Sequence, residues 1–168
     1  STLSKEIWKE ADNMGIKEML FQGVASMIIE RPGRNKSLEQ WCEELVKTGN
    51  KIEARAAAAE NAPGASGVLR HITGIERWSQ NRLRVFLGEA YTRDEYDHYQ
   101  PGATLDLAGQ IAAFQETRTE TIALARQLQM AGSTAPATVD HNDFGPLSAR
   151  GWLAYINSHA SRESTRIK

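Results

Sequence analysis

The residues best suited to chemistry are a histidine and a glutamate, His159 and Glu163, four positions apart near the end of the chain. Side chains at i and i+4 of a helix lie on one face, so these two could share one ligand. Imidazole nitrogens and carboxylate oxygens both bind divalent metal ions. The same spacing is common on solvated helix surfaces, so a metal site requires a third ligand from another segment.

His71 is the candidate for that third ligand. It occurs with Val68, Ile75 and Trp78 on an otherwise apolar helical face. A histidine in such a place either has a hydrogen-bond partner in the core or faces a polar pocket. The residue types alone leave both interpretations open.

The other histidines and the single cysteine are predicted to have no chemical role. His98 and His141 occur in polar segments, where we expect solvated side chains. Cys42 shares a helical stripe with Trp41 and Leu45, which indicates a small buried residue rather than a reactive thiol. One cysteine also allows no intramolecular disulfide and no cysteine-based zinc site.

Helices are predicted to position these residues. An apolar face predicts a first helix up to about Glu30, and the neighbouring proline and glycine predict a loop over residues 31–36. A second helix begins at Ser37, because the segment from Ser37 to Gln40 has the form of a capping box. It is expected to end by residues 61–64, where proline and glycine occur together again.

Three further helices complete the predicted fold. The third covers residues 67–87 and is followed by a polar connection over residues 88–104. The fourth ends at about Gln129, residues 130–145 form a loop, and the last helix begins near residues 146–148. We expect no strand. The sequence therefore predicts an all-α protein, an antiparallel four-helix bundle with an additional N-terminal helix.

Length and composition predict one folded domain. The 168 residues are 40% hydrophobic and 24% charged, and 20 basic residues are dispersed among 21 acidic ones. This charge pattern gives no support for nucleic-acid binding. Apolar stretches are far shorter than the ~20 residues that cross a bilayer, so no membrane association is expected. The charged N-terminal residues are unlike a signal peptide, which favours a cytoplasmic location.

Two segments resemble the DinB-like superfamily. Residues 68–78 are similar to its early-helix motif, in which a histidine in a leucine-x-histidine-isoleucine setting is followed by a tryptophan. Residues 144–153, followed by His159 and Ile167, are similar to its closing motif. The resemblance covers residues 37–168, so residues 1–36 would be an N-terminal helix and loop within the same domain.

The resemblance implies a four-helix bundle that binds a divalent metal through one histidine of the early helix and two of the last. His71 and His159 match the first two ligands, whereas Glu163 stands where a histidine is usual. A carboxylate still binds Zn, Ni, Mn or Fe, so the difference changes ligand charge and metal preference. Zn or Ni is the expected ion, with Fe or Mn as alternatives.

The resemblance also implies an enzyme that acts on a small molecule. Characterised relatives include thiol S-transferases that use bacillithiol and isomerases that use mycothiol. We therefore expect metal-dependent thiol transfer or hydrolysis, with a low-molecular-weight thiol as a possible cofactor. Trp78, Trp152 and Tyr155 are candidate pocket walls, although aromatic residues at helical spacing are more often core.

Other functions stay open. One is a non-catalytic bundle in which the metal site is degraded. Another is a non-haem iron oxidoreductase, because two histidines and one carboxylate are the usual ligand set of such enzymes. A homodimer formed through the apolar face of the first helix is also predicted.

Overall fold

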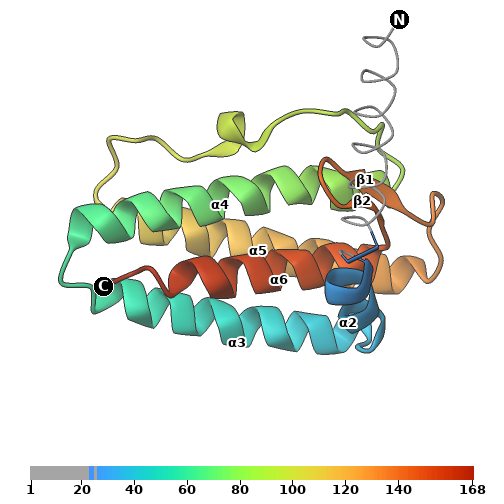
Figure 1. Cartoon of the computed structure of the whole chain (residues 1–168), viewed down its shortest axis with the longest axis horizontal. Coiled ribbons are helices and arrows are strands. Elements are labelled where there is room, and N and C mark those ends of the chain that lie inside the picture. Colours follow the sequence, from blue (N-terminus) through green and yellow to red (C-terminus); the bar gives the residue numbers. More distant parts are fainter. Residues whose placement is uncertain (1–22, 25) are drawn as a thin grey trace, which may run out of the picture.

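A computed structural model describes residues 23, 24 and 26–168, and this part of the chain is mostly helical (Figure 1). Its elements are, in chain order, η1 (Ser26–Glu30, a π-helix), α2 (Arg31–Arg34), α3 (Leu38–Ala57), α4 (Ala62–Val85), η2 (Tyr96–Tyr99, a 3-10 helix), α5 (Leu107–Ala131), β1 (Val139–His141), β2 (Gly145–Leu147) and α6 (Ala149–Ser164). The expected all-α fold is thus right in outline, with a small sheet added. Most of the predicted N-terminal helix lies outside the described residues. Within them, no helix is both long and apolar enough to span a membrane.

Four long helices, α3 to α6, lie side by side (Figure 1). Both α5 and α6 pack against α3 and against α4. α4 and α6 are antiparallel, since His71 meets His159 and, further along α4, Trp78 meets Trp152.

α4 and α5 instead run in the same direction. Arg77 donates a hydrogen bond to Thr117, and Arg84, further along α4, donates one to Glu120. The predicted antiparallel order is therefore correct for α4 with α6 and wrong for α4 with α5.

The reason is the long connection between α4 and α5, residues 86–106, here called the strap. It crosses back over the length of α4, so that α5 begins near the end where α4 began (Figure 1). The backbone carbonyl of Asp94 accepts a hydrogen bond from Trp78 in the second half of α4, and that of Pro101 accepts one from Arg70 in the first half. The strap is therefore hydrogen-bonded to both halves of α4.

Local capping sets where helices begin. α3 begins as predicted: Ser37 Oγ accepts a hydrogen bond from the Gln40 amide, and Gln40 Oε1 accepts one from the Ser37 amide. This is the reciprocal pattern of a capping box. α6 also begins where expected, with Ser148 as its N-cap accepting from the Gly151 amide.

Proline in the first turn explains two wrong boundaries. α4 begins at Ala62 rather than at residue 67, because Asn61 caps it and Pro63 lies in its first turn. Pro32 likewise lies in the first turn of α2, where a loop was predicted. The fixed φ of proline suits a first turn, where the missing N–H has no helical partner anyway.

The predicted loop over residues 130–145 contains the end of α5 and a small hairpin. β1 and β2 pair in antiparallel fashion, with Val139 opposite Leu147 and His141 opposite Gly145. Gly145 has a φ of +72°, a left-handed conformation that favours glycine. Val139 and Leu147 are buried, so the hairpin is part of the core and not a solvated loop.

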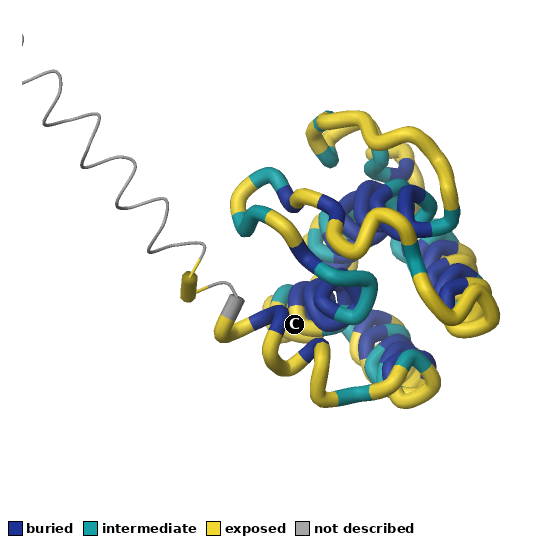
Figure 2. Tube along the Cα trace, turned by 90° about the vertical axis from the view of Figure 1, so that its right-hand side faces the viewer, coloured by how far each residue is buried: buried dark blue, intermediate teal, exposed yellow. Residues whose placement is uncertain are grey.

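The inward faces of the helices form the hydrophobic core. Figure 2 looks along the helices and shows buried residues on the sides that face one another and exposed residues on the outside. Two clusters make up this core, one containing Trp41, Leu45, Trp78 and Trp152, and the other Ile52, Leu69, Ile72 and Phe114. On α3 the inward face includes the buried residues Trp41, Leu45, Ile52 and Ala56.

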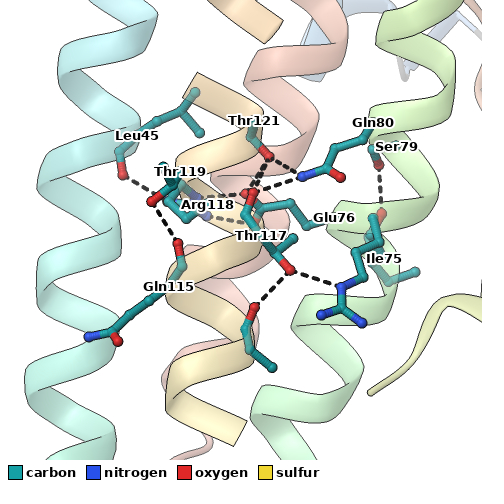
Figure 3. A network of polar contacts seen from close by, with 12 residues as sticks. Leu45, Ile75, Glu76, Ser79, Gln80, Gln115, Thr117, Arg118, Thr119 and Thr121 are labelled. Atoms are coloured by element: carbon teal, nitrogen blue, oxygen red, sulfur yellow. Dashed lines mark hydrogen bonds and ion pairs between the residues drawn. The ribbon is translucent and has the colours of Figure 1, made fainter. Parts of the chain in front are cut away.

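A buried ion pair joins α4 and α5 within the core (Figure 3). The Glu76 carboxylate accepts hydrogen bonds from Arg118 Nε at 2.7 Å and Nη2 at 2.9 Å, and the two side chains are 2% and 4% exposed. Arg118 also donates to the Leu45 carbonyl of α3, and Thr121 donates to Glu76. These bonds satisfy both charges and tie three helices together.

Candidate metal centre

Two of the predicted ligands meet between α4 and α6. The imidazole rings of His71 and His159 have centroids 5.1 Å apart, at an interplanar angle of 58°. His159 is 8% exposed and His71 is half-buried. The packing of two antiparallel helices therefore brings together residues that are far apart in the sequence.

Burial keeps His159 in the form that can bind a metal. Burial, together with the nearby His71, lowers the pKa of His159 from its ordinary 6.5 to about 4, against a smaller opposite effect of Glu163. The ring is therefore neutral at pH 7 and keeps a nitrogen lone pair. Neutral imidazole is the form that ligates metal ions.

Glu163, the third predicted ligand, lies one turn beyond His159 and is hydrogen-bonded to an arginine. Its Oε2 accepts a hydrogen bond from Arg166 Nη1 at 2.8 Å. That hydrogen bond, helped by the nearby His159, lowers the pKa of Glu163 below its ordinary value, although partial burial opposes the shift. The carboxylate is thus ionised but is paired with an arginine.

The donor set fits a divalent ion in part. Among the described residues, no group of three or more His, Cys, Asp or Glu side chains is arranged to hold a metal ion. Two imidazoles are in place, and Glu163 would complete the set only after turning away from Arg166. The chemistry of these three donors suits Zn, Ni, Mn or Fe.

Aromatic side chains flank the two histidines. Tyr96 of η2 makes an edge contact with His71 at 5.6 Å between ring centroids, and Tyr155 lies against His159 at 5.8 Å. Tyr155 was a predicted pocket wall, and burial raises the pKa of its hydroxyl well above the ordinary value. Tyr96 was not singled out, because the sequence does not show that the strap returns over α4.

The two other predicted wall residues lie deeper. Trp78 and Trp152 contact each other at 5.5 Å between ring centroids and are 3% and 0% exposed. Their indole nitrogens donate hydrogen bonds to the carbonyls of Asp94 and Val139 respectively. They therefore fix the strap and the hairpin to the core.

Asp94 is the main attachment point of the strap. Its carboxylate accepts a hydrogen bond from Arg82 Nη1 at 2.6 Å and another from the Tyr99 hydroxyl. Partial burial alone would raise the pKa of Asp94, but these two hydrogen bonds lower it below its ordinary value. This attachment positions the segment that carries Tyr96 over His71.

His141 contradicts the sequence prediction of a solvated side chain. It is 4% exposed and stacks on Phe144 at 4.5 Å between ring centroids. Its ring also makes edge contact with Tyr155 at 4.5 Å and with Trp78 at 5.1 Å. The polar residues around it in sequence obscured the short hairpin that turns it inward. The aromatic residues that follow in the chain were the only available signal.

The exposure of His98 and the burial of Cys42 are as the sequence predicted. His98 is exposed on the strap, as expected. Cys42 is 8% exposed, and burial raises the pKa of its thiol, which favours the unreactive protonated form.

Comparisons with known proteins add no relative. No protein-family model, no curated protein and no solved structure matches this chain. The interpretation of the site therefore depends on its own geometry and on the sequence motifs.

Proposed function

We propose that this protein is a divalent-metal-binding enzyme of the DinB-like superfamily, a four-helix bundle that carries out thiol transfer or hydrolysis on a small molecule. The observation that carries the proposal is the approach of His71 and His159 to 5.1 Å between ring centroids. The two long helices that carry these histidines support the same interpretation, as do the burial of His159 and the partial burial of His71. The cytoplasmic location expected from the sequence stays part of this proposal.

Each residue has a defined part in this proposal. His71 and His159 bind the ion through their imidazole rings, and Glu163 adds a carboxylate after it leaves Arg166. A bound divalent ion supplies Lewis acidity, which lowers the pKa of a coordinated thiol or water. Three protein ligands leave room for such a molecule, for example a low-molecular-weight thiol. Tyr96 and Tyr155 limit the access of bulk water.

The first test is the metal content of histidine variants. His71→Ala and His159→Ala should each weaken Zn or Ni binding by at least about tenfold, the loss that even outer-sphere partners of a metal site can cause. Helicity should change little, because most of the core is apolar. Elemental analysis of protein purified without a metal-affinity column, with far-UV circular dichroism, measures both. His98→Ala is the matched control on an exposed histidine. Unchanged metal content in both site variants would rule out the site.

Glu163 offers a sharper test of the third ligand. Glu163→His should tighten Zn or Ni binding, because imidazole is a favoured donor for these ions and does not pair with Arg166. Arg166→Ala combined with Arg162→Ala should also tighten binding, since it removes both arginines paired with the carboxylate without touching a ligand. Glu163→Ala should weaken it less than loss of either histidine if water takes its place. If the double arginine variant has no effect while Glu163→His does, the native carboxylate is not a ligand.

The pairing of Glu163 with Arg166 favours one alternative, a non-catalytic bundle with a degraded metal site. In that case the wild-type protein takes up no metal at stoichiometric concentration, whereas Glu163→His restores uptake. A non-haem iron oxidoreductase is the other alternative, and recovery of iron rather than zinc or nickel would favour it.

A further inference from the structure

The two ring nitrogens of His141 have different surroundings. Nδ1 accepts hydrogen bonds from the backbone amides of Asp143 at 3.1 Å and Phe144 at 3.3 Å. Nε2 is buried and has no hydrogen-bond partner among the residues that the structure describes. With the residue only 4% exposed, the second nitrogen is a polar atom held inside an aromatic cluster.

The hydrogen bonds identify the tautomer. Because Nδ1 accepts, it carries no proton, and a neutral ring must then carry its proton on Nε2. Burial, with smaller contributions from the nearby Arg82 and His159, lowers the pKa of His141 from 6.5 to about 3, so the ring is neutral at pH 7. Nε2 is therefore a hydrogen-bond donor. A buried donor without an acceptor is destabilising, and such a group in a native fold calls for an explanation.

The position of His141 connects it to the candidate metal centre. Tyr155 contacts both rings, at 4.5 Å from His141 and 5.8 Å from His159 between centroids. Phe144, which stacks on His141, is half-buried, as is His71 at the other end of this row. His141, Tyr155 and His159 are thus buried in this row of rings, whereas Phe144 and His71 at its two ends are half-buried.

The surrounding charges determine which ligand suits this donor. Arg82, the cation that most affects His141, is already bound to Asp94. Two acidic residues, Asp143 and Glu163, lie near Tyr155 and His159 respectively. Without bound metal, an anion placed here would lose its hydration without gaining an unpaired cation, because Arg162, the other cation near these rings, lies 3.9 Å from the Glu163 carboxylate. A neutral acceptor, such as a carbonyl oxygen on a flat apolar body, fits the aromatic walls and the single N–H donor.

We propose that His141 is a ligand-binding residue, whose Nε2–H donates a hydrogen bond to the carbonyl oxygen of a neutral, apolar small molecule bound beside His71 and His159. The inference rests on the proposed function in one respect: it identifies this carbonyl compound as the substrate class of the same site. The proposal gives His141 a role in ligand binding, separate from the metal ligands His71, His159 and Glu163.

The test uses benzamide as a probe, with benzoate as its anionic counterpart. The full chain, both loaded with zinc and after removal of metal by EDTA, is titrated while the histidine ring nitrogens are followed by 15N NMR. We expect the His141 signals to show the Nε2–H tautomer and to shift saturably with benzamide. Benzoate should bind the EDTA-treated protein at least about tenfold more weakly than benzamide, because its charge meets no unpaired cation there. An Nδ1–H tautomer, or the absence of a saturable shift, would overturn the proposal.

A substitution that preserves the turn isolates the hydrogen bond. In His141→Asn, Oδ1 can accept the same backbone amides as Nδ1, whereas the distal N–H is lost. Benzamide affinity should fall about fivefold to tenfold, the size of one hydrogen bond. His98→Asn, the same change at an exposed histidine, should leave it unchanged. Equal affinity of His141→Asn and wild type would contradict the proposal.

Two further measurements keep the test decisive. If His141→Asn does not fold, the wild-type titration still decides, as does a crystal structure with benzamide. In that structure, an ordered water that keeps Nε2 as its partner contradicts the proposal, and benzamide oxygen on Nε2 supports it. Metal content is measured separately in His71→Ala and His159→Ala. If the histidine variants lose metal but the wild-type protein does not bind benzamide, only the inference about His141 is wrong. If the wild-type protein binds benzamide but takes up no metal, only the proposed metal-dependent function is wrong.

Discussion

Buried polar residues in this protein stay inside the fold in two ways. Glu76 and Arg118 form an ion pair with each other, whereas His141 and His159 lose their charge because burial lowers the pKa of each ring. Both outcomes follow from the cost of removing a charge from water. The first fixes the positions of helices, and the second supplies neutral nitrogen atoms to the candidate site.

The buried ion pair predicts a large effect of removing one partner. Glu76→Ala should lower the free energy of unfolding by about 3 to 5 kcal/mol, because Arg118 would stay buried without a counter-charge. Urea denaturation measures this change. Glu120→Ala removes the partner of Arg84 at the surface and should cost less than about 1 kcal/mol. Equal effects of the two substitutions would show that burial does not distinguish these pairs.

Single residues also show how far the sequence could predict the site. His159 was identified by its spacing from Glu163 and by the closing motif, and His71 by its apolar helical face. The partner of Glu163 was missed, because Arg166 was only one of many charged residues nearby. His141 was missed for a different reason: its direction depends on a three-residue strand, which is too short to leave a periodic pattern.

At the scale of elements, the helices were predictable and their order in space was not. Apolar periodicity and the Ser37 capping box located α3, and similar patterns located α4, α5 and α6 within a few residues. The direction of α5 depends on the strap, whose polar sequence contains no signal for its path. Specific hydrogen bonds, above all those of Asp94, decide that path.

Asp94 should therefore control the strap. The Arg82 side chain is only 1% exposed, and in Asp94→Asn it loses its counter-charge. We therefore expect the free energy of unfolding to fall by about 2 kcal/mol. Amide hydrogen exchange should accelerate in residues 92–100 and much less in α3 and α5. Mass spectrometry resolves these segments. Asp97→Asn, on an exposed residue of the same strap, is the control, and similar exchange in both variants would refute this role.

At the scale of the whole molecule, the predicted homodimer depends on residues that mostly lie outside the described part of the chain. The described portion presents Val24, Met27 and Ile28 as exposed apolar side chains, whereas Ile29 and Glu30 are buried. A deletion that tests the dimer should therefore end at residue 28. Deletion of residues 1–28 should convert a dimer to a monomer with little change in melting temperature, as measured by light scattering and calorimetry. An unchanged mass would exclude dimerisation through this segment.

Stability should also depend on pH through the buried imidazoles. Burial lowers the pKa of His141 to about 3, whereas an unfolded chain has the ordinary value of 6.5. Between these values the unfolded chain binds a proton that the folded chain does not. The free energy of unfolding must then fall as the pH is lowered from about 6.5 toward 3, and this contribution is fully present above 6.5. His159 shifts in the same direction and adds to the effect.

The slope of this dependence can be assigned to His141 with one variant. One proton of difference changes the free energy of unfolding by about 1.4 kcal/mol per pH unit. Urea denaturation of the EDTA-treated protein is measured between about pH 7.5 and pH 4.5, the range in which an unfolded histidine takes up its proton. The slope should approach two protons in the lower part of this range. In His141→Asn the slope should fall by about one proton, whatever the absolute stability of the variant, because asparagine does not titrate. His98→Asn should keep the full slope, since an exposed imidazole has a similar environment in both states. Identical slopes for His141→Asn and wild type would mean that His141 is protonated inside the folded protein, which contradicts the neutral Nε2–H donor inferred for the site.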